Sequence, residues 1–477
     1  MRRRYFRVMV AAHSAALCTA VVAAPMGWRG DGTGRYPGAR PPPTWQDTTN
    51  GTVNVVWKTR MPDWSNASPI VVGDRIFVCA EPDKLICVSA DDGRILWERA
   101  NPFLELLPPD RAEKARELEE RGAALNKEMK ATKDRITRLG RKIGRAPDDP
   151  ALKEQLSELQ KKQSALKKER RTIAQYVVPE QGRIAGYSTP TPTSDGTHVY
   201  ALFATGAAVC YDLEGNRKWG RIVEIKNHKW GHSASPLLVG DKLLVQILNL
   251  IALDTDTGET VWERKTPWGW CSPVHVRIGG ADAVLTGKGA LVRVADGEVI
   301  MPNVKRGGDS GASPVVHDGV AYLVAGKGIT AVQLPDTLEE KTKQTVLWKA
   351  YPKITPKKQA YYQSPVYHDG VLYAIASRLE FWLSAIDAGS GEIFYTKRLM
   401  LAGKRAYPSI TLAGNVLHVA SEGVAYVFEP GREYKQLAEN RLENYRSCPV
   451  FAGDRMYVRG LEHLYCIGGP AEPGPGQ

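Results

Sequence analysis

The chain has 477 residues, of which 43% are hydrophobic and 24% charged, with 45 glycines and 31 prolines. This length exceeds one ordinary compact core, and the many glycines and prolines indicate an all-β repeat protein rich in tight turns. The net charge of +12 is local, because the first ten residues carry +4 and residues 110–171 carry +7, which leaves about +1 elsewhere. No basic face is needed to explain the charge, so we expect no nucleic-acid partner.

The N-terminus has the three parts of a secretory signal peptide, which we assign to residues 1–24. MRRRYFR is positively charged, the stretch from Val8 to Ala24 is largely apolar, and small residues precede position 25. We therefore predict a secreted or periplasmic protein. A retained membrane anchor is the alternative, although the apolar run is short for a bilayer. Residues 25–52 are rich in Gly and Pro and predict a lead-in that runs across the folded part.

Eight copies of a short unit account for most of the chain. Each opens with Ser-Pro or a variant of it, continues through apolar strands joined by Gly/Asp turns, and often ends on a strand with Trp. The copies begin near Ala67, Thr191, Ala234, Cys271, Ala312, Gln363, Pro408 and Ser447. Counted between their Pro positions (Ile410 in the seventh), they are 123, 44, 37, 41, 51, 45 and 39 residues apart. A period near 40–45 residues with about four strands predicts an all-β fold, an eight-bladed β-propeller.

Two features recur within the unit. Asp residues such as Asp254 precede a Gly in the turn before the last strand, where the carboxylate can accept bonds from nearby backbone amides. Tryptophan then follows in several copies, at Trp97, Trp219, Trp262 and Trp348. We interpret these tryptophans as packing between blades, rather than as a stack for a cofactor.

Residues 108–178 interrupt the first interval with a different composition. They are rich in Glu, Lys, Arg, Leu and Ala, and apolar residues recur near helical spacing on both sides of a Gly/Pro/Asp break at 144–149. This pattern predicts an antiparallel coiled-coil hairpin of two helices, inserted after blade 1. It is either an arm that contacts a partner or a solvated hairpin closed on itself.

The two ends of the repeat region are complementary. The last copy stops at HLYCIGG, before any Trp strand, whereas VNVVWKTR (Val53 to Arg60) resembles the last strand of the first copy. Pairing these ends would remove the open edges of the ring. We therefore predict a propeller formed by residues 53–107 and 179–469, followed by a disordered tail at 470–477.

Six cysteines would remain after signal cleavage, and none has the CxxC or CxxCH spacing of a zinc or haem site. Each lies in or beside an apolar, strand-like run, so we expect buried small side chains. In an oxidising compartment, Cys79 and Cys87 on neighbouring predicted strands are the best candidates for a disulfide.

The segment LIALDTDTGETVW (Leu250 to Trp262) resembles the A-x-D-x-x-T-G-x-x-x-W repeat of the quinoprotein alcohol dehydrogenase-like superfamily of PQQ-like propellers. That superfamily includes dehydrogenases that use pyrroloquinoline quinone (PQQ) and non-catalytic, BamB-like scaffolds. The resemblance implies the fold but no activity. The dehydrogenases typically have adjacent cysteines, a Trp under the quinone, and Asp, Asn and Glu ligands, and this pattern cannot be placed on the chain. We therefore assign no catalytic residue and no cofactor, and PQQ with calcium remains an alternative without recognisable ligands.

The segments before the Ser-Pro positions should converge at one mouth of the central channel, and they are rich in aromatic and charged residues. Such a surface suits a small-molecule or peptide ligand, although the same residues could simply cap the blade ends. The candidate ligand-binding residues are Trp64, Tyr187, Trp230, His232, Trp268, Trp270, Asp309, Tyr362, Arg405, Tyr445 and Arg446. His228 and His232 are four residues apart but have no evident third ligand, so we expect no metal site.

Three functions agree with these observations. The first is an exported, non-catalytic binding or assembly scaffold, with a protein partner at the hairpin or a propeller face. The second is a PQQ-dependent oxidoreductase with an atypical site. The third is saccharide or peptide binding at the mouth. Peripheral membrane association is a further hypothesis that we consider for the Lys/Arg-rich second helix of the insert, although acidic residues are interspersed there.

Overall fold

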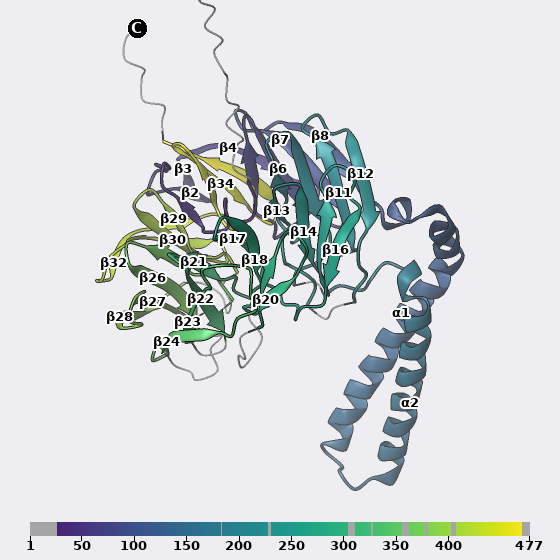
Figure 1. The fold of residues 1–477 in the computed structure, drawn as a ribbon. Helices are drawn as coiled ribbons and strands as arrows, with labels where there is room; N and C mark the ends of the chain where they lie inside the picture. The colour runs from purple at the N-terminus through teal and green to yellow at the C-terminus, as the bar shows by residue number, and fades with distance from the viewer. Residues whose placement is uncertain are drawn as a thin grey trace, which may run out of the picture.

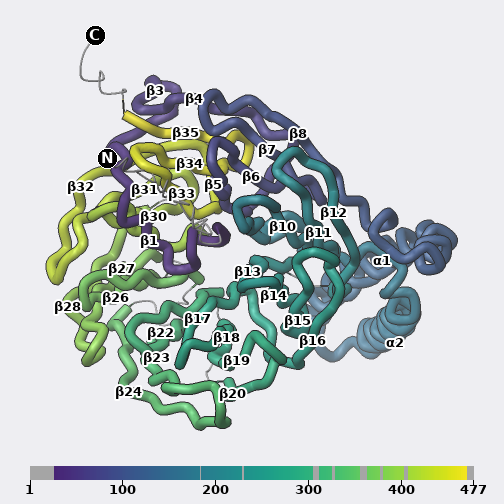
Figure 2. Tube along the Cα trace, turned by 45° about the horizontal axis from the view of Figure 1, so that its top comes forward, coloured from purple at the N-terminus to yellow at the C-terminus, as the bar shows by residue number. Residues whose placement is uncertain are grey.

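The computed structural model describes residues 26–182, 184–227, 230–303, 311–325, 328–354, 362–376, 380–401 and 407–469. The predicted signal peptide and tail lie outside these ranges. Eight antiparallel β-sheets surround a central axis, and a two-helix arm projects from the side of the ring (Figures 1 and 2). This arrangement confirms the predicted eight-bladed β-propeller.

Each of the first four blades is a sheet of four consecutive strands. Blade 1 comprises β5 (Ile70–Val72), β6 (Arg75–Ala80), β7 (Lys84–Ser89) and β8 (Ile95–Ala100). Blade 2 comprises β9 (Thr193–Ser194), β10 (His198–Leu202), β11 (Ala207–Asp212) and β12 (Arg217–Ile222). Blade 3 comprises β13 (Leu237–Val239), β14 (Lys242–Gln246), β15 (Leu250–Asp254) and β16 (Thr260–Arg264). Blade 4 comprises β17 (Val274–Ile278), β18 (Ala281–Leu285), β19 (Leu291–Arg293) and β20 (Val299–Met301).

The remaining blades follow the same order. Blade 5 comprises β21 (Val315–His317), β22 (Val320–Ala325), β23 (Gly328–Gln333) and β24 (Thr345–Ala350). Blade 6 comprises β25 (Val366–His368), β26 (Val371–Ala376), β27 (Phe381–Asp387) and β28 (Ile393–Leu399). Blade 7 comprises β29 (Thr411–Ala413), β30 (Val416–Ser421), β31 (Val424–Glu429) and β32 (Lys435–Arg441). Blade 8 comprises β33 (Val450–Ala452), β34 (Arg455–Arg459), β35 (His463–Ile467) and, from the other end of the chain, β4 (Val55–Arg60).

The ring closes as the sequence predicts. Strand β4 pairs antiparallel with β35, and Trp57 lies opposite Cys466. Blade 8 therefore takes its outermost strand from the N-terminal part of the chain and its three inner strands from the C-terminal part. Closing the last blade in this way leaves no unpaired edge between the first and last repeats.

Tryptophans on the outer strands join neighbouring blades, which confirms that they pack between blades. Five indole Nε1–H groups donate to carbonyls of the next blade, in the pairs Trp57–Ala90, Trp97–Leu213, Trp219–Thr255, Trp262–Val294 and Trp348–Ala388, at 2.7–3.2 Å. Each ring also lies against a glycine of that blade. At Gly258, for example, a Cβ would come within 2.6 Å of the Trp219 ring. The Asp254 carboxylate holds the same turn by accepting a bond from Thr257 N at 2.9 Å.

The Ser-Pro positions form a second ring of bonds at the inner ends of the blades, which we call the hydroxyl belt. The backbone N–H of one blade donates to the side chain of the equivalent residue in the next blade. The described bonds are Ser68–Thr191, Thr191–Ser235, Ser235–Ser272, Ser313–Ser364, Ser364–Ser409, Ser409–Cys448 and Cys448–Ser68, at 2.9–3.2 Å. The belt explains why a short hydroxyl residue precedes the proline in most repeats.

The insert is a helical hairpin, as predicted. Helices α1 (Pro109–Ile143) and α2 (Pro150–Thr172) are flanked by the 3-10 turns η1 (Phe103–Leu106) and η2 (Ala174–Tyr176). Leu106 anchors the base in the core between blades 1 and 2, and Figure 1 shows the hairpin pointing away from the propeller. The Asp149 carboxylate caps α2 by accepting bonds from Ala151 N and Leu152 N.

The expected disulfide between Cys79 and Cys87 does not form. Both cysteines are free and buried, which agrees with their alternative assignment as small core side chains. The antiparallel register of β6 and β7 places Cys79 opposite Leu85 and Cys87 opposite Phe77. The two cysteines therefore lie on neighbouring strands without facing each other, and a bridge would require a register shift.

Candidate functional site: the two ends of the central channel

The lead-in crosses one end of the central channel. Met26 bridges to Ser194 in blade 2, and β1 (Arg35–Tyr36) pairs in parallel with β29 in blade 7. Strands β2 (Gln46–Thr48) and β3 (Gly51–Val53) then extend the outer edge of blade 7. Figure 2 shows the segment, in purple, lying across the centre of the ring. Strand β1 ends opposite Ala413, the last residue of β29, so its backbone leaves the channel at the end away from the Ser-Pro positions. The Arg29 side chain, in contrast, reaches back to the Ser-Pro positions at Pro365 and Ile410.

Arg29 closes the axis from within this lead-in. Its side chain is fully buried, with 0% exposure. Nη2 donates to the carbonyls of Pro365 and Ile410, each at 2.8 Å, and the guanidinium lies 5.3 Å from the centre of the Trp28 ring. Burial lowers the pKa of Arg29, because removal from water disfavours the charged guanidinium. No carboxylate of the described residues forms an ion pair with Arg29 that would offset this effect. The axial space between blades 6 and 7 is thus occupied by a side chain of the protein itself.

At the opposite end, Trp64 and Tyr187 lie beside each other on blades 1 and 2. The Trp64 ring covers Gly186, where a Cβ would come within 2.7 Å of it. Glu81 holds this segment, because its carboxylate accepts bonds from Ser188 N at 2.7 Å, Ser188 Oγ at 2.6 Å and Tyr187 N at 2.9 Å. Burial raises the pKa of Glu81, while these hydrogen bonds act in the opposite direction.

The tryptophans of blades 3 and 4 continue the same surface. Trp230 accepts a bond from Ala185 N at 3.2 Å through its carbonyl, and its side chain is 40% exposed. Trp270 donates to Gly231 O at 3.2 Å and packs edge-on against Trp268, with ring centres 5.5 Å apart. We call Trp64, Tyr187, Trp230, Trp268 and Trp270 the aromatic arc. It follows the mouth over four consecutive blades.

A lysine with altered acidity lies at the end of the arc. Lys226 Nζ is 2.8 Å from the centre of the Trp268 ring, a cation–π contact. Burial lowers the pKa of Lys226 to about 8, although the nearby Glu224 favours the charged form.

Arg446 joins blade 8 to the opposite end of the arc, near Trp64 and Tyr187. Its Nη1 donates to Ile184 O at 3.0 Å, and its guanidinium lies 5.2 Å from the centre of the Tyr407 ring. Asn66 Nδ2 donates to the same carbonyl at 2.9 Å. Ile184 precedes Tyr187 in the loop that leads into blade 2, so these contacts fix the loop between the arc and blade 8.

The other predicted residues are dispersed. His232 is buried, with 5% exposure, and Tyr362 is half-buried next to Gly311. Tyr445 is only 3% exposed and lies in the core between blades 7 and 8, away from the aromatic arc. Asp309 and Arg405 fall outside the described residues.

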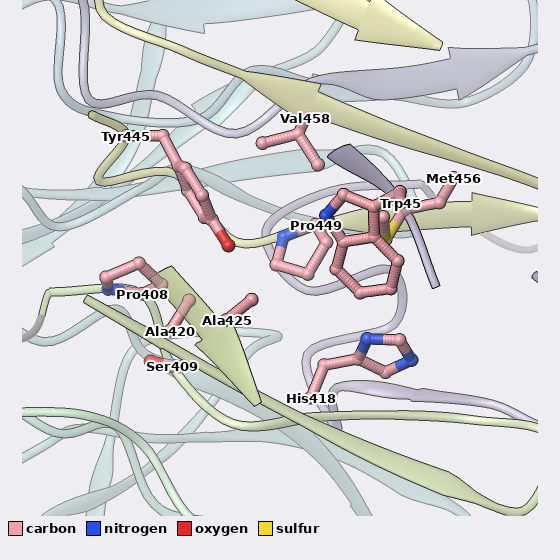
Figure 3. A pocket seen from close by; sticks show the side chains of 10 residues that line it. All are labelled: Trp45, Pro408, Ser409, His418, Ala420, Ala425, Tyr445, Pro449, Met456 and Val458. Atoms are coloured by element: carbon pink, nitrogen blue, oxygen red, sulfur yellow. The ribbon is translucent and has the colours of Figure 1, made fainter. Parts of the chain in front are cut away.

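Tyr445 lines an internal cavity together with Trp45 and His418 (Figure 3). The cavity volume of about 10 Å³ suits a single water molecule. Trp45 comes from the lead-in and stacks on His418, with ring centres 5.6 Å apart, and Asn440 Oδ1 accepts a bond from Trp45 N at 2.8 Å. Burial lowers the pKa of His418 to about 3, so the imidazole is neutral. This cavity is too small for a ligand larger than a single water molecule, and it lies where the lead-in packs on blades 7 and 8.

The sequence analysis missed Arg29, Trp45, Glu81 and Lys226. Glu81 follows strand β6 instead of preceding a Ser-Pro position, and Lys226 lies four residues before Trp230, the first candidate residue of blade 3. Arg29 and Trp45 belong to the lead-in, whose composition predicts a crossing segment but not its contacts. The repeat pattern alone therefore identifies only the arc.

The residues described here do not fit a calcium-bound quinone. Calcium requires six to eight oxygen ligands, usually including several carboxylates, and the described ranges contain no group of three or more His, Cys, Asp or Glu side chains that could hold a metal ion. Glu81, a carboxylate next to the arc, is already engaged by Ser188 and Tyr187. The fully buried side chain of Arg29 occupies the axial space of the propeller.

The belt, the tryptophan contacts and the swapped outer strand define the class of protein, an eight-bladed propeller of PQQ-like repeats. The chain belongs to the family described as "Outer membrane protein assembly factor BamB", whose sequence profile matches residues 47–123 and 249–467, more than half of the chain. No curated protein sequence matches the chain significantly.

Solved structures of two kinds share this fold. BamB from Moraxella catarrhalis is 10% identical with a TM-score of 0.54, and the match covers 87% of this chain and 99% of that one. Quinohemoprotein alcohol dehydrogenase from Comamonas testosteroni is 11% identical with a TM-score of 0.54, covering 89% of this chain and 78% of that one. At such identities the likeness shows the fold alone. In the part of the chain that the structure describes, no helix is long and apolar enough to cross a membrane.

Proposed function

We propose that this protein is an exported, non-catalytic scaffold that binds a protein partner at the mouth of its propeller. The family description, an outer membrane protein assembly factor, supports an assembly role. The predicted signal peptide at residues 1–24 supports export. Secreted or periplasmic localisation is part of this proposal.

One observation carries the proposal: the channel is filled at one end by the lead-in, while the other end presents the aromatic arc. Arg29 is fully buried at the axis, whereas Trp230 remains 40% exposed at the arc. Aromatic side chains with a few charged neighbours, here Lys226 and Arg446, are typical of the anchoring centre of a protein interface. The arc is also held rigidly by Glu81 and by bonds between loops, which reduces the entropic cost of binding.

An extended peptide or loop is the partner chemistry that suits this surface best. The arc extends over blades 1 to 4, and the backbone carbonyls of Ile184, Trp230 and Gly231 beside or within it are already bonded within the protein. Recognition would therefore rest on stacking and burial of apolar side chains. Flat tryptophan faces also suit the rings of a saccharide, which is the second binding hypothesis.

A PQQ-dependent oxidoreductase remains the alternative of a different class. The fold of Comamonas testosteroni quinohemoprotein alcohol dehydrogenase favours it, whereas the absence of a suitable ligand group among the described residues argues against it.

Peptide and glycan arrays test the proposal directly. We expect wild-type protein to bind a subset of peptides, and Trp230→Ala and Trp268→Ala to lose that binding while retaining the fold. The matched control is Trp348→Ala, which removes a tryptophan that packs between blades on the outer side. Glycan binding lost in the same two variants would establish the saccharide hypothesis instead. Peptide binding that survives both arc substitutions would refute the assignment of the arc.

A further inference from the structure

We infer that the outer face of helix α1 is a docking surface for an anionic lipid membrane. Residues 130–145, the distal end of α1 and the following turn, contain seven Lys or Arg residues and a single acid, Asp134. The basic residues are Lys130, Lys133, Arg135, Arg138, Arg141, Lys142 and Arg145, and all seven are exposed. We call this set the basic tip. The inference is independent of the scaffold function.

The basic tip retains a net charge of about +6, because Asp134 is the single acid among its seven basic residues. The ion pairs of the hairpin lie nearer its base, at Lys114–Glu117, Arg121–Glu128 and Arg121–Glu169. Within the described chain, no residue of the basic tip forms an ion pair with an acid. Seven like charges along about 22 Å of helix repel one another unless an anionic surface neutralises them.

The charges face away from the second helix. Leu125, Thr132 and Leu139 recur every seven residues, are buried, and mark the seam with α2. Lys130, Arg138 and Arg141 are displaced from this seam by roughly 100–180° around the helix, and Arg145 lies in the turn after Ile143, the last residue of α1. The acids near the tip on the other arm, Asp148, Asp149, Glu154 and Glu158, precede or belong to α2. They lie across the hairpin, about 10 Å or more from the outer face, where salt screens them.

The chemistry of the tip favours a lipid surface over a protein. Protein interfaces are depleted in Lys, and although Arg is enriched in them, their desolvated centres are built on aromatic and apolar side chains. The tip offers none of these anchors, because its apolar residues Ile136, Leu139 and Ile143 are buried or half-buried along the seam. A helix with one basic face and no exposed apolar side chains to insert into lipid is suited to the surface of an anionic membrane, where each Lys or Arg adds to the electrostatic attraction. Figure 1 shows that the hairpin carries this end well clear of the propeller.

Vesicle flotation of the full chain tests the inference. The vesicles are phosphatidylcholine alone or phosphatidylcholine with about 30% phosphatidylglycerol, in low and high salt. The tip variant carries Lys130→Glu, Arg138→Glu, Arg141→Glu and Arg145→Glu. The matched control carries Arg94→Glu, Lys265→Glu, Lys343→Glu and Lys349→Glu, four exposed propeller positions with the same change in net charge. All proteins share one N-terminus, so any binding by its apolar segment is common to them.

We expect wild type and control to partition onto the anionic vesicles at least about tenfold more strongly than the tip variant, and to lose this difference in high salt. A glutamine version of the four tip substitutions should reproduce the loss with helicity unchanged by circular dichroism. Equal binding by wild type and tip variants would overturn the inference. No preference of the wild type for anionic vesicles would overturn it as well, and would leave an acidic protein surface as the partner class.

Discussion

Gly258→Ala tests whether the tryptophan–glycine contacts hold the ring together. Gly258 has a φ of +72°, and a Cβ there would lie 2.6 Å from two atoms of the Trp219 ring. An L-residue in this conformation costs roughly 1–2 kcal/mol. Displacing the ring adds roughly 1–3 kcal/mol, and weakening the 2.7 Å bond from Trp219 Nε1 to Thr255 O adds roughly 1 kcal/mol. We expect the free energy of unfolding to fall by roughly 3–6 kcal/mol.

Gly240→Ala is the matched control. Gly240 lies in the same blade with a φ of +57°, but a Cβ there would meet nothing within 4 Å. Its substitution should cost only the conformational part, roughly 1–2 kcal/mol. Urea unfolding of both variants, repeated in a Trp219→Ala background, completes a double-mutant cycle. In that background the two alanines should cost the same. Equal destabilisation of the wild-type protein by Gly258→Ala and Gly240→Ala would refute the reasoning. The same would follow if Gly258→Ala remained the more destabilising of the two in the Trp219→Ala background.

Three further predictions concern the belt, the cavity and the lead-in. Cys448→Ala should lower the free energy of unfolding by roughly 1–3 kcal/mol, because Ser409 N–H loses its buried acceptor. Cys448→Ser, measured by the same urea unfolding, should retain the stability of the wild type. His418 is neutral when folded but titrates near pH 6.5 when unfolded, so stability should fall as pH drops from about 6.5 towards 3, by up to about 1.4 kcal/mol per unit. His418→Gln should flatten that slope in pH-dependent unfolding, and an unchanged slope would contradict the assignment. Arg29→Ala should cost roughly 2–4 kcal/mol and expose residues 26–36 to hydrogen exchange, and unchanged exchange protection would argue against the plug.

Local signals in the sequence were sufficient to predict the ring. The Ser-Pro starts predict the first strand of each blade, and the resemblance of Val53–Arg60 to the end of the first copy predicts how the ring closes. The role of the serine in each Ser-Pro start could not be predicted from the repeat, because its hydroxyl accepts a hydrogen bond from the backbone of a different blade, the one before it. Seven such bonds give the belt, and Cys448 substitutes for serine in one of them.

The contacts of the lead-in and the mouth could not be predicted because they join residues far apart in the chain. Arg29 bonds to Pro365 and Ile410, 336 and 381 residues away. Tyr445 precedes a Ser-Pro-type position like the residues of the arc, but it points into the core between blades 7 and 8. The side-chain direction in each of these segments depends on the neighbouring blade. Composition therefore indicates an aromatic mouth without specifying which aromatics lie on it.

Titration with PQQ and calcium tests the central claim most directly. Purified full-length protein is dialysed to equilibrium against PQQ with Ca²⁺, and bound cofactor is measured by its absorbance, with thermal unfolding and reduction of an artificial electron acceptor as parallel readouts. A scaffold whose axis is filled by Arg29 should bind no stoichiometric cofactor, should show no saturable thermal shift, and should reduce no dye. A one-to-one complex that reduces dye with an alcohol substrate would contradict the account and establish the oxidoreductase.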